Sequence, residues 1–197
     1  VLDVDIDIQD SENAFPLGKN NDGAVEFRNV NFGYDPLYPV LKSLSFRINP
    51  GETVAIVGPT GCGKSTTMAL LRRLYDVTDG SVLVAGHDVR NVTQASLGRH
   101  IAMVLQEPYL FTGTILDNIR YSSDWANDET VIEAAIAVGA HDFIRSMPNG
   151  YDTMLVERGS NLSLGQRQLL SFARALVTDA KILIMDEATA NIDSYTE

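Results

Sequence analysis

The chain has 197 residues, 45% hydrophobic and 21% charged, which is the composition of a globular protein with a substantial core. Its net charge of -11 repels nucleic-acid backbones and argues against DNA or RNA as the main partner. No apolar run reaches the roughly 18 residues that a transmembrane helix needs, and the single cysteine, Cys62, excludes a disulfide within the chain.

Residues 1–24 form an acidic segment that we expect to be a linker. It holds six acidic residues against one basic residue, Lys19, and its later part contains proline and glycine. Apolar residues alternate with aspartates from Asp3 to Ile8, which allows one edge strand. A solvated tail is the other interpretation of this composition. Because the first residue is not methionine, we expect the chain to be part of a longer protein.

From Val25 onward, short apolar runs and alternating patterns predict a series of strands. The run at residues 53–57 is followed by a glycine-rich loop, and the run at residues 182–185 is continuously apolar, as in a strand that is buried on both faces of a parallel sheet. The expected strands lie near residues 25–32, 44–48, 53–57, 81–85, 101–105 and 182–185.

Helical spacing of apolar residues predicts three helices. The first follows the glycine-rich loop and should bury Met68, Leu71, Leu74 and Tyr75. The second begins at Asp128. The third runs from about Ser163 to Val177, with its buried stripe expected at Leu169, Leu170, Phe172, Ala173 and Leu176.

The glycine-rich loop at Gly58–Ser65 fits the phosphate-binding pattern G-x-x-x-x-G-K-S. Its glycines let backbone N–H groups turn toward phosphate oxygens, and the following helix points its positive end at the same anion. Lys64 would neutralise the β- and γ-phosphates, and Ser65 would place a hydroxyl on Mg²⁺. Cys62 occupies a free position of the motif, either as a small residue without a role or as a reactive thiol.

Two acidic residues, Asp186 and Glu187, follow the apolar run at residues 182–185. Ligands of open α/β sheets bind at the carboxyl ends of strands, where these side chains fall. We therefore assign Asp186 to Mg²⁺ and Glu187 to the general base that activates water. A solvated acidic pair at a strand end is the alternative.

With these motifs in place, Val25–Glu197 resembles the ATP-binding cassette (ABC) family, and within it the exporter type. The resemblance implies an α/β fold: a P-loop NTPase (RecA-like) core, an antiparallel β subdomain, and a helical subdomain at about residues 108–170. It also implies that the ATP-binding domain, residues 25–197, is incomplete, because the switch histidine of the family would lie beyond residue 197. None of His87, His100 or His141 replaces it by position.

The resemblance assigns further roles. Tyr34 matches the aromatic residue that stacks on adenine, although a tyrosine that only lines a turn is the alternative. Gln106 matches the Q-loop glutamine, which contacts Mg²⁺ and water. Residues 110–119 resemble the exporter surface that meets intracellular helices of the membrane domain, with a buried loop-to-helix junction as the alternative.

Residues 162–166, Leu-Ser-Leu-Gly-Gln, resemble the family signature Leu-Ser-Gly-Gly-Gln, with Leu164 in place of the first glycine. Ser163 and Gln166 also form an S-x-x-Q capping box, which alone explains a helix start here. Asp193 matches the family's D-loop aspartate, whereas Asn191 departs from that motif. The implied nucleotide-binding residues are Tyr34, Gly58, Gly61, Cys62, Gly63, Lys64, Ser65, Thr66, Ser163, Gly165 and Gln166.

These residues lead us to expect a MgATP-binding ATPase that works as a head-to-tail homo- or heterodimer of cassettes. Catalytic roles fall to Glu187, Lys64 and Gln106, and metal binding to Ser65, Gln106 and Asp186. Hydrolysis would drive export through transmembrane domains, on the cytoplasmic side of the membrane, and the isolated chain should be weakly active or inactive. A soluble ABC ATPase and a nucleotide sensor that does not hydrolyse ATP are the alternatives.

Overall fold

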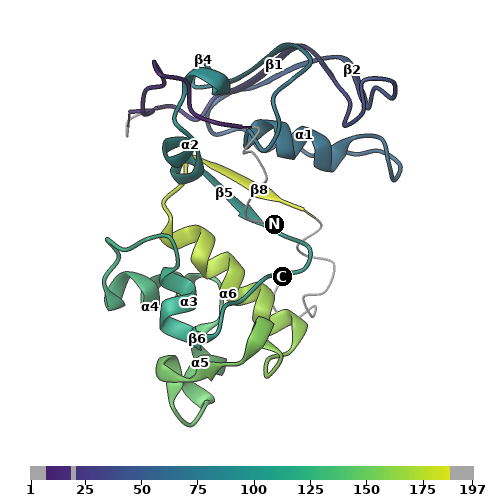
Figure 1. Ribbon diagram of the computed structural model, residues 1–197. Coiled ribbons are helices and arrows are strands. Elements are labelled where there is room, and N and C mark those ends of the chain that lie inside the picture. The colour runs from purple at the N-terminus through teal and green to yellow at the C-terminus, as the bar shows by residue number, and fades with distance from the viewer. Residues whose placement is uncertain (1–7, 19–20, 187–197) are drawn as a thin grey trace, which may run out of the picture. The chain divides into compact units, whose positions relative to one another are not determined.

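The structure is a computed structural model that describes residues 8–18 and 21–186. The chain divides into two compact units, residues 1–101 and 102–197, each of which has its own helices and strands (Figure 1). Within the described ranges, no helix combines the length and apolar character that crossing a membrane would require.

The first unit is built on a four-stranded sheet with the order β2-β1-β3-β4, in which all neighbours are antiparallel. Phe27 pairs with Phe46 on one side and with Val82 on the other, and the two phenylalanine rings stack with centroids 4.7 Å apart. The antiparallel β subdomain that the sequence predicts is therefore present. The strands are β1 (Val25–Phe32), β2 (Leu41–Ile48), β3 (Asp79–Val84) and β4 (His87–Asp88).

Helix α1 (Lys64–Leu71) begins at the end of the glycine-rich loop, as predicted, but it is shorter than its apolar pattern indicates. Leu70 and Leu71 are buried, whereas Leu74 and Tyr75 lie beyond the helix and are exposed. The helix ends because Arg73 takes a left-handed conformation with a φ of +52° and pairs with Asp76 at 3.0 Å. The prediction that Leu74 and Tyr75 belong to its buried face is wrong.

The run Thr53–Val57 is not a strand in this structure, so the strand predicted there is wrong. Val54, Ile56 and Val57 are exposed, Val57 to 87%. A β-strand needs a neighbour that takes up its backbone N–H and C=O groups, and no strand in the described part of the chain pairs with this run. An apolar sequence favours the extended conformation but does not supply that neighbour.

Residues 8–18 of the acidic segment are attached to the first unit at two places. At the first, the N–H of Phe15 donates to the carbonyl of Asn91 in the single turn η1 (Val89–Asn91) at 3.1 Å, and the N–H of Leu17 donates to Ser96 Oγ in helix α2 (Gln94–His100) at 2.7 Å. At the second, just beyond α1, buried Arg73 donates to the carbonyl of Gln9 at 3.0 Å. This part of the expected linker is therefore fixed to the phosphate-loop unit.

The second unit has a helical core. Helices α3, α4 and α6 pack around buried Ile119, Val131 and Leu170, and the short pair β6–β7 lies beside them (Figure 1). The expected helices at Asp128 and Ser163 are confirmed. The elements are β6 (Gly113–Thr114), α3 (Ile115–Arg120), α4 (Asp128–Ala137), α5 (His141–Ser146), η2 (Gly150–Asp152), β7 (Met154–Leu155), η3 (Glu157–Gly159) and α6 (Leu164–Val177).

The buried stripe of helix α6 matches the prediction at Leu170 and Ala173 but not at the other three positions. Its buried residues are Gln168, Leu170, Ser171, Ala173 and Val177. Leu176, which the spacing assigns to the core, is exposed, and Leu169 and Phe172 are only partly buried. The polar Gln168 and Ser171 therefore lie on the buried face, and hydrophobicity alone cannot predict that.

The two strands that the apolar runs predict are present, and β5 (Ile101–Val104) pairs with β8 (Ile182–Met185). The expectation that β8 is buried on both faces is wrong, because Leu183 and Met185 are exposed while Ile184 is buried. Side chains alternate between the two faces of a strand, and here one face is open.

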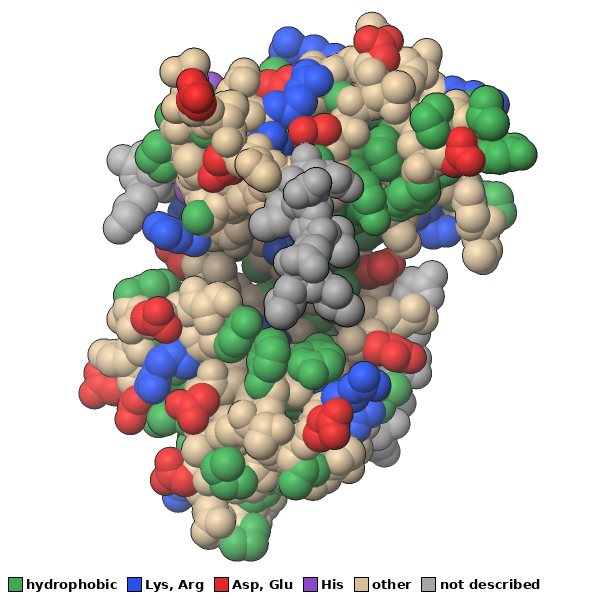
Figure 2. All heavy atoms as spheres, in the orientation of Figure 1, with side chains coloured by type: hydrophobic (Ala, Val, Ile, Leu, Met, Phe, Trp, Pro, Cys, Tyr) green, Lys and Arg blue, Asp and Glu red, His purple; other side chains and the backbone are tan. Residues whose placement is uncertain are grey.

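Charged side chains of both signs are interspersed on the face shown in Figure 2, with hydrophobic side chains between them. The net charge of -11 is therefore not gathered into one acidic patch on this face. Local basic groups can attract an anion in spite of the net charge.

Candidate functional site

The loop that precedes α1 turns on two left-handed glycines. Gly61 has a φ of +82° and Gly63 a φ of +96°, and both values disfavour residues that carry a Cβ. A Cβ placed on Gly63 would lie 2.6 Å from Cδ2 of Leu41, and one on Gly58 would lie 2.6 Å from Sγ of Cys62. Gly63 is therefore in close contact with the side chain of Leu41 on β2, and Gly58 with that of Cys62 in the same loop.

We expect Gly63→Ala to lower the free energy of unfolding by about 1–3 kcal/mol, because it adds a steric clash to an unfavourable backbone conformation. Gly51→Ala is the matched control: its φ is +76°, but no atom lies within 4 Å of the added Cβ. Gly98→Ala in α2, where φ is ordinary and space is open, should be neutral or stabilising. Denaturant unfolding of the three variants checks this order. If Gly63→Ala and Gly51→Ala were equally stable, the contact with Leu41 would carry no cost.

Lys64, the first residue of α1, turns back toward the loop. Its Nζ donates to the carbonyl oxygens of Gly58 at 2.8 Å and Pro59 at 3.2 Å. The ammonium group is thus held at the mouth of the loop by neutral acceptors. Phosphate oxygens are stronger acceptors than carbonyls for this cation, because the hydrogen bond is then between opposite charges.

Tyr34 and Thr66, both predicted to bind nucleotide, are brought together by the fold. Tyr34 lies between β1 and β2, and its hydroxyl is 3.2 Å from Oγ1 of buried Thr66 in α1. The ring packs edge-on against Phe32 and Tyr75, and the side chain is 57% exposed. A tyrosine fixed at its hydroxyl end with much of its surface open suits stacking against a planar ligand.

The signature segment forms the N-terminus of α6 in the second unit. Ser163 is the cap: its Oγ accepts from the N–H of Gln166 at 3.2 Å, and Oε1 of Gln166 accepts from the N–H of Ser163 at 2.9 Å. The predicted capping box is therefore confirmed. It leaves Gly165 and the other first-turn amides at the positive end of a 14-residue helix.

Gln106 and Asp186 lie at one end of the β5–β8 pair. The N–H of Asp186 donates to the carbonyl of Val104 at 3.0 Å, two residues before Gln106. The strands therefore deliver both predicted metal ligands to the same edge. Glu187, Asn191 and Asp193 lie outside the described residues. Among those described, no group of three or more histidine, cysteine, aspartate or glutamate residues could hold a metal ion by itself.

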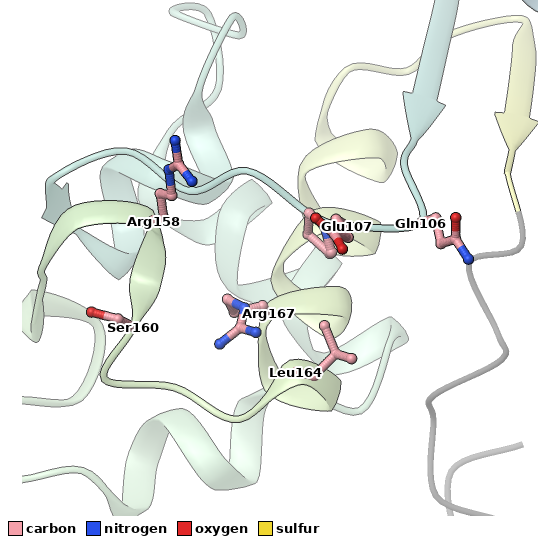
Figure 3. A pocket seen from close by; sticks show the side chains of 7 residues that line it. Gln106, Glu107, Arg158, Ser160, Leu164 and Arg167 are labelled. Carbon is pink, nitrogen blue, oxygen red and sulfur yellow. The ribbon is translucent and has the colours of Figure 1, made fainter.

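A hollow of about 470 Å³ opens beside the signature helix. Figure 3 shows the guanidinium of Arg167 extending from α6 toward the loop that carries Ser160, whereas that of Arg158 points away from it. Arg167 also donates to the carbonyl of Leu162 at 2.6 Å, which secures the segment before the cap. The residues that line the hollow are Gln106, Glu107, Pro108, Arg158, Ser160, Leu164 and Arg167.

The segment at residues 110–119 is neither a free loop nor wholly buried. Leu110, Ile115 and Ile119 are buried, and a Cβ on Gly159 would lie 2.8 Å from Cδ1 of Leu110. The loop before the signature thus packs directly on this segment. Arg174 of α6 reaches the same segment, which the sequence reasoning missed: it lies within an apolar run and has no motif to mark it.

The glycine-rich turn, the lysine at its mouth and the helix behind it define the class of this protein, a P-loop nucleotide-binding domain. Comparisons with known proteins then identify the family. The family described as "ABC transporter" matches residues 41–190. The chain therefore belongs to the ABC transporter family, and its fold is that of an ABC-type P-loop NTPase domain, as the sequence predicts.

The relatives are exporter-type proteins or ABC proteins of unassigned role. The chain is 47% identical, over its whole length, to "uncharacterized ABC transporter ATP-binding protein YfiC" of Bacillus subtilis (strain 168) and spans 32% of that protein. It is 45% identical, again over its whole length, to the "ATP-dependent lipid A-core flippase" of Syntrophus aciditrophicus (strain SB), of which it spans 32%.

A solved structure described as a bacterial Atm1-family ABC exporter with ATP bound has a similar fold. It superposes with a TM-score of 0.94 at 44% identity, over 99% of this chain and 34% of the exporter chain. The chain thus spans about a third of the length of these relatives.

Proposed function

We propose that the chain binds MgATP and, as one of a pair of cassettes, hydrolyses it to drive export through transmembrane domains. The loop at Gly58–Lys64 carries this proposal. Gly61 is left-handed and has no atom within 4 Å of the place of a Cβ, which leaves room for phosphate oxygens. Lys64 donates to two loop carbonyls, and phosphate oxygens could replace these as its acceptors. Tyr34, fixed through Thr66, would stack on the adenine.

Mg²⁺ fits the oxygen donors that the proposal assigns to it. Ser65, Gln106 and Asp186 offer a hydroxyl, an amide oxygen and a carboxylate, which are the ligand types this ion prefers. When bound, the ion would neutralise charge on the β- and γ-phosphates. Lys64 would hold the same phosphates, Gln106 would also contact the attacking water, and Glu187 would take the proton from that water.

The second cassette supplies the other half of each site in this proposal. The N-terminus of α6, with Ser163, Gly165 and Gln166, would bind the γ-phosphate of ATP held by the partner's loop. ATP then joins two cassettes head to tail, and hydrolysis releases them. The pair is a homodimer or a heterodimer.

Export is favoured over a soluble ABC ATPase by the relatives. The proteins named above include a lipid A-core flippase and an Atm1-family exporter. Those relatives are about three times as long as this chain, which leaves room for transmembrane domains. In such an assembly the chain would lie on the cytoplasmic side of the membrane, and residues 110–119 would face the membrane domain.

Ser163 tests the shared-site proposal, because two substitutions separate its capping role from phosphate binding. Ser163→Ala removes the acceptor for the N–H of Gln166 and should lower stability by about 1 kcal/mol. Ser163→Asp keeps a good cap but places a negative charge where the γ-phosphate would lie. We expect the aspartate variant to be the more stable and the less active of the two in an ATPase assay of the complete protein.

The two readouts must therefore rank the variants in opposite orders. If ATP hydrolysis simply followed stability, so that Ser163→Asp were the more active, Ser163 would only cap the helix. The signature would then not bind phosphate, and the head-to-tail arrangement would lose its support.

A further inference from the structure

Arg174 in α6 is a partly buried cation that has no acidic partner among the described residues. Among the described residues, no carboxylate lies within salt-bridge distance of its guanidinium, whereas four other arginines each have one. Burial removes water from the group and lowers the pKa of Arg174 below its ordinary value. Partial burial of a cation without a carboxylate partner is unfavourable, so the contacts that compensate for it indicate what the residue does. The four paired arginines are Arg28, Arg73, Arg90 and Arg120.

Within the described part of the chain, the side-chain hydrogen bonds of Arg174 all go to one segment, residues 109–118. Nε donates to the carbonyl of Asn118 at 2.8 Å, Nη1 to the carbonyl of Tyr109 at 3.0 Å, and Nη2 to Oδ1 of Asn118 at 3.2 Å. These acceptors belong to the loop and helix that precede Tyr121. Only a planar, forked cation can reach three acceptors so arranged, which a lysine ammonium cannot do in the same way.

Asn118 extends this network along the segment. It is 3% exposed, its Oδ1 also accepts from the N–H of Phe111 at 2.8 Å, and its Nδ2 donates to the carbonyls of Phe111 and Thr114 at 2.9 and 3.0 Å. Arg174 therefore fixes the residue that closes the loop between Phe111 and Asn118.

The same guanidinium lies behind a cluster of exposed rings, Tyr109, Phe111 and Tyr121. Its Cζ is 5.4 Å from the centroid of Tyr121 and 5.9 Å from that of Phe111. Phe111 and Tyr121 stack with centroids 4.4 Å apart, and Tyr109 meets Phe111 edge-on at 5.1 Å. The three side chains are still 47%, 39% and 48% exposed. Such rings held in a fixed arrangement at a surface suit contact with another protein.

We propose that Arg174 is a positioning residue that holds Tyr109, Phe111 and Tyr121 in the arrangement that a cytoplasmic helix of the membrane domain contacts. This inference rests on the proposed exporter function for the identity of the partner. It concerns a residue outside the nucleotide motifs, on the same helix as the signature, and it assigns Arg174 to the coupling between ATP hydrolysis and export rather than to ATP binding.

Arg174→Lys in the complete protein tests the proposal, since it keeps the charge and loses the fork. We expect amide hydrogen exchange at residues 109–121 to become at least about tenfold faster. Exchange in α4, for example at Val131, should stay unchanged. ATP affinity and basal hydrolysis should be retained, whereas substrate-stimulated hydrolysis and transport should fall. Arg145→Lys, at an exposed site on α5 of the same unit, is the matched control.

Two outcomes overturn the proposal. In the first, the exchange rate at residues 109–121 equals that of the control variant, or the rate rises equally throughout the second unit. Arg174 would then have no specific role in positioning the rings. The second is faster local exchange with full coupling, which would show that the ring arrangement does not serve the membrane domain. Should Arg174→Lys fold poorly, Tyr121→Leu provides the same coupling test without touching the cation.

The proposed function can fail separately. A wild-type protein that hydrolyses ATP but transports nothing would contradict the exporter assignment, whatever the exchange data show. Exchange at residues 109–121 needs no transported substrate, so the positioning role of Arg174 would still be decided by its own measurement.

Discussion

ATP should bind at least about tenfold more weakly when Lys64 is replaced by alanine, because a charge-assisted hydrogen bond to phosphate contributes more than a neutral one. Among the described residues, its Nζ has only the carbonyls of Gly58 and Pro59 as acceptors. Those bonds are accessible to water, so losing them should change stability little. The substitution thus acts on nucleotide binding and not on folding. Titration with ATP, followed by calorimetry or a fluorescent analogue, measures the effect.

Lys42→Ala is the matched control for charge. Lys42 lies on β2 of the same unit and is exposed. Its replacement by alanine removes the same positive charge as Lys64→Ala does. Its ATP affinity should stay within about twofold of wild type at moderate salt, because distant surface charges are screened. Equal losses in the two variants would mean that Lys64 acts only through net charge, and the phosphate role given to the loop would be wrong.

Sequence patterns predicted those elements that are determined by residues close together in the chain. The apolar residues at positions 25, 27, 30 and 32 predicted strand β1, and the spacing of Ser163 and Gln166 predicted the start of α6, since both depend on residues a few positions apart. The glycines at positions 61 and 63 adopt positive φ as the phosphate motif requires.

The failures involve partners that are distant in sequence. The apolar pattern at Thr53–Val57 does not indicate which strand would pair with it. The end of α1 depends on Arg73, which also donates a hydrogen bond to Gln9, 64 residues away in sequence. Arg174 is the clearest case, because its acceptors at Asn118 and Tyr109 are 56 and 65 residues away. A single arginine in an apolar run gives no local sign of such a network.

The other large effect is expected at Glu187, which lies outside the described residues and directly follows Asp186. Glu187→Gln keeps the size and the hydrogen-bonding oxygen of the side chain but removes its ability to take a proton. We expect hydrolysis to fall by about 10²–10⁴-fold, the usual contribution of a general base, while ATP binding is retained. An ATP-held pair of cassettes should then accumulate, because the step that releases it is blocked.

Size-exclusion chromatography with light scattering in the presence of ATP detects that pair, and phosphate release measures turnover. Asp179→Asn, in the exposed turn after α6, is the control for losing one carboxylate in the same unit, and it should hydrolyse ATP normally. If Glu187→Gln hydrolysed ATP at the wild-type rate, Glu187 would not be the general base. Loss of ATP binding in the same variant would instead indicate that Glu187 holds the nucleotide or its ion, a role that we give to Asp186. The two readouts therefore distinguish a residue that acts on water from one that acts on the bound phosphates.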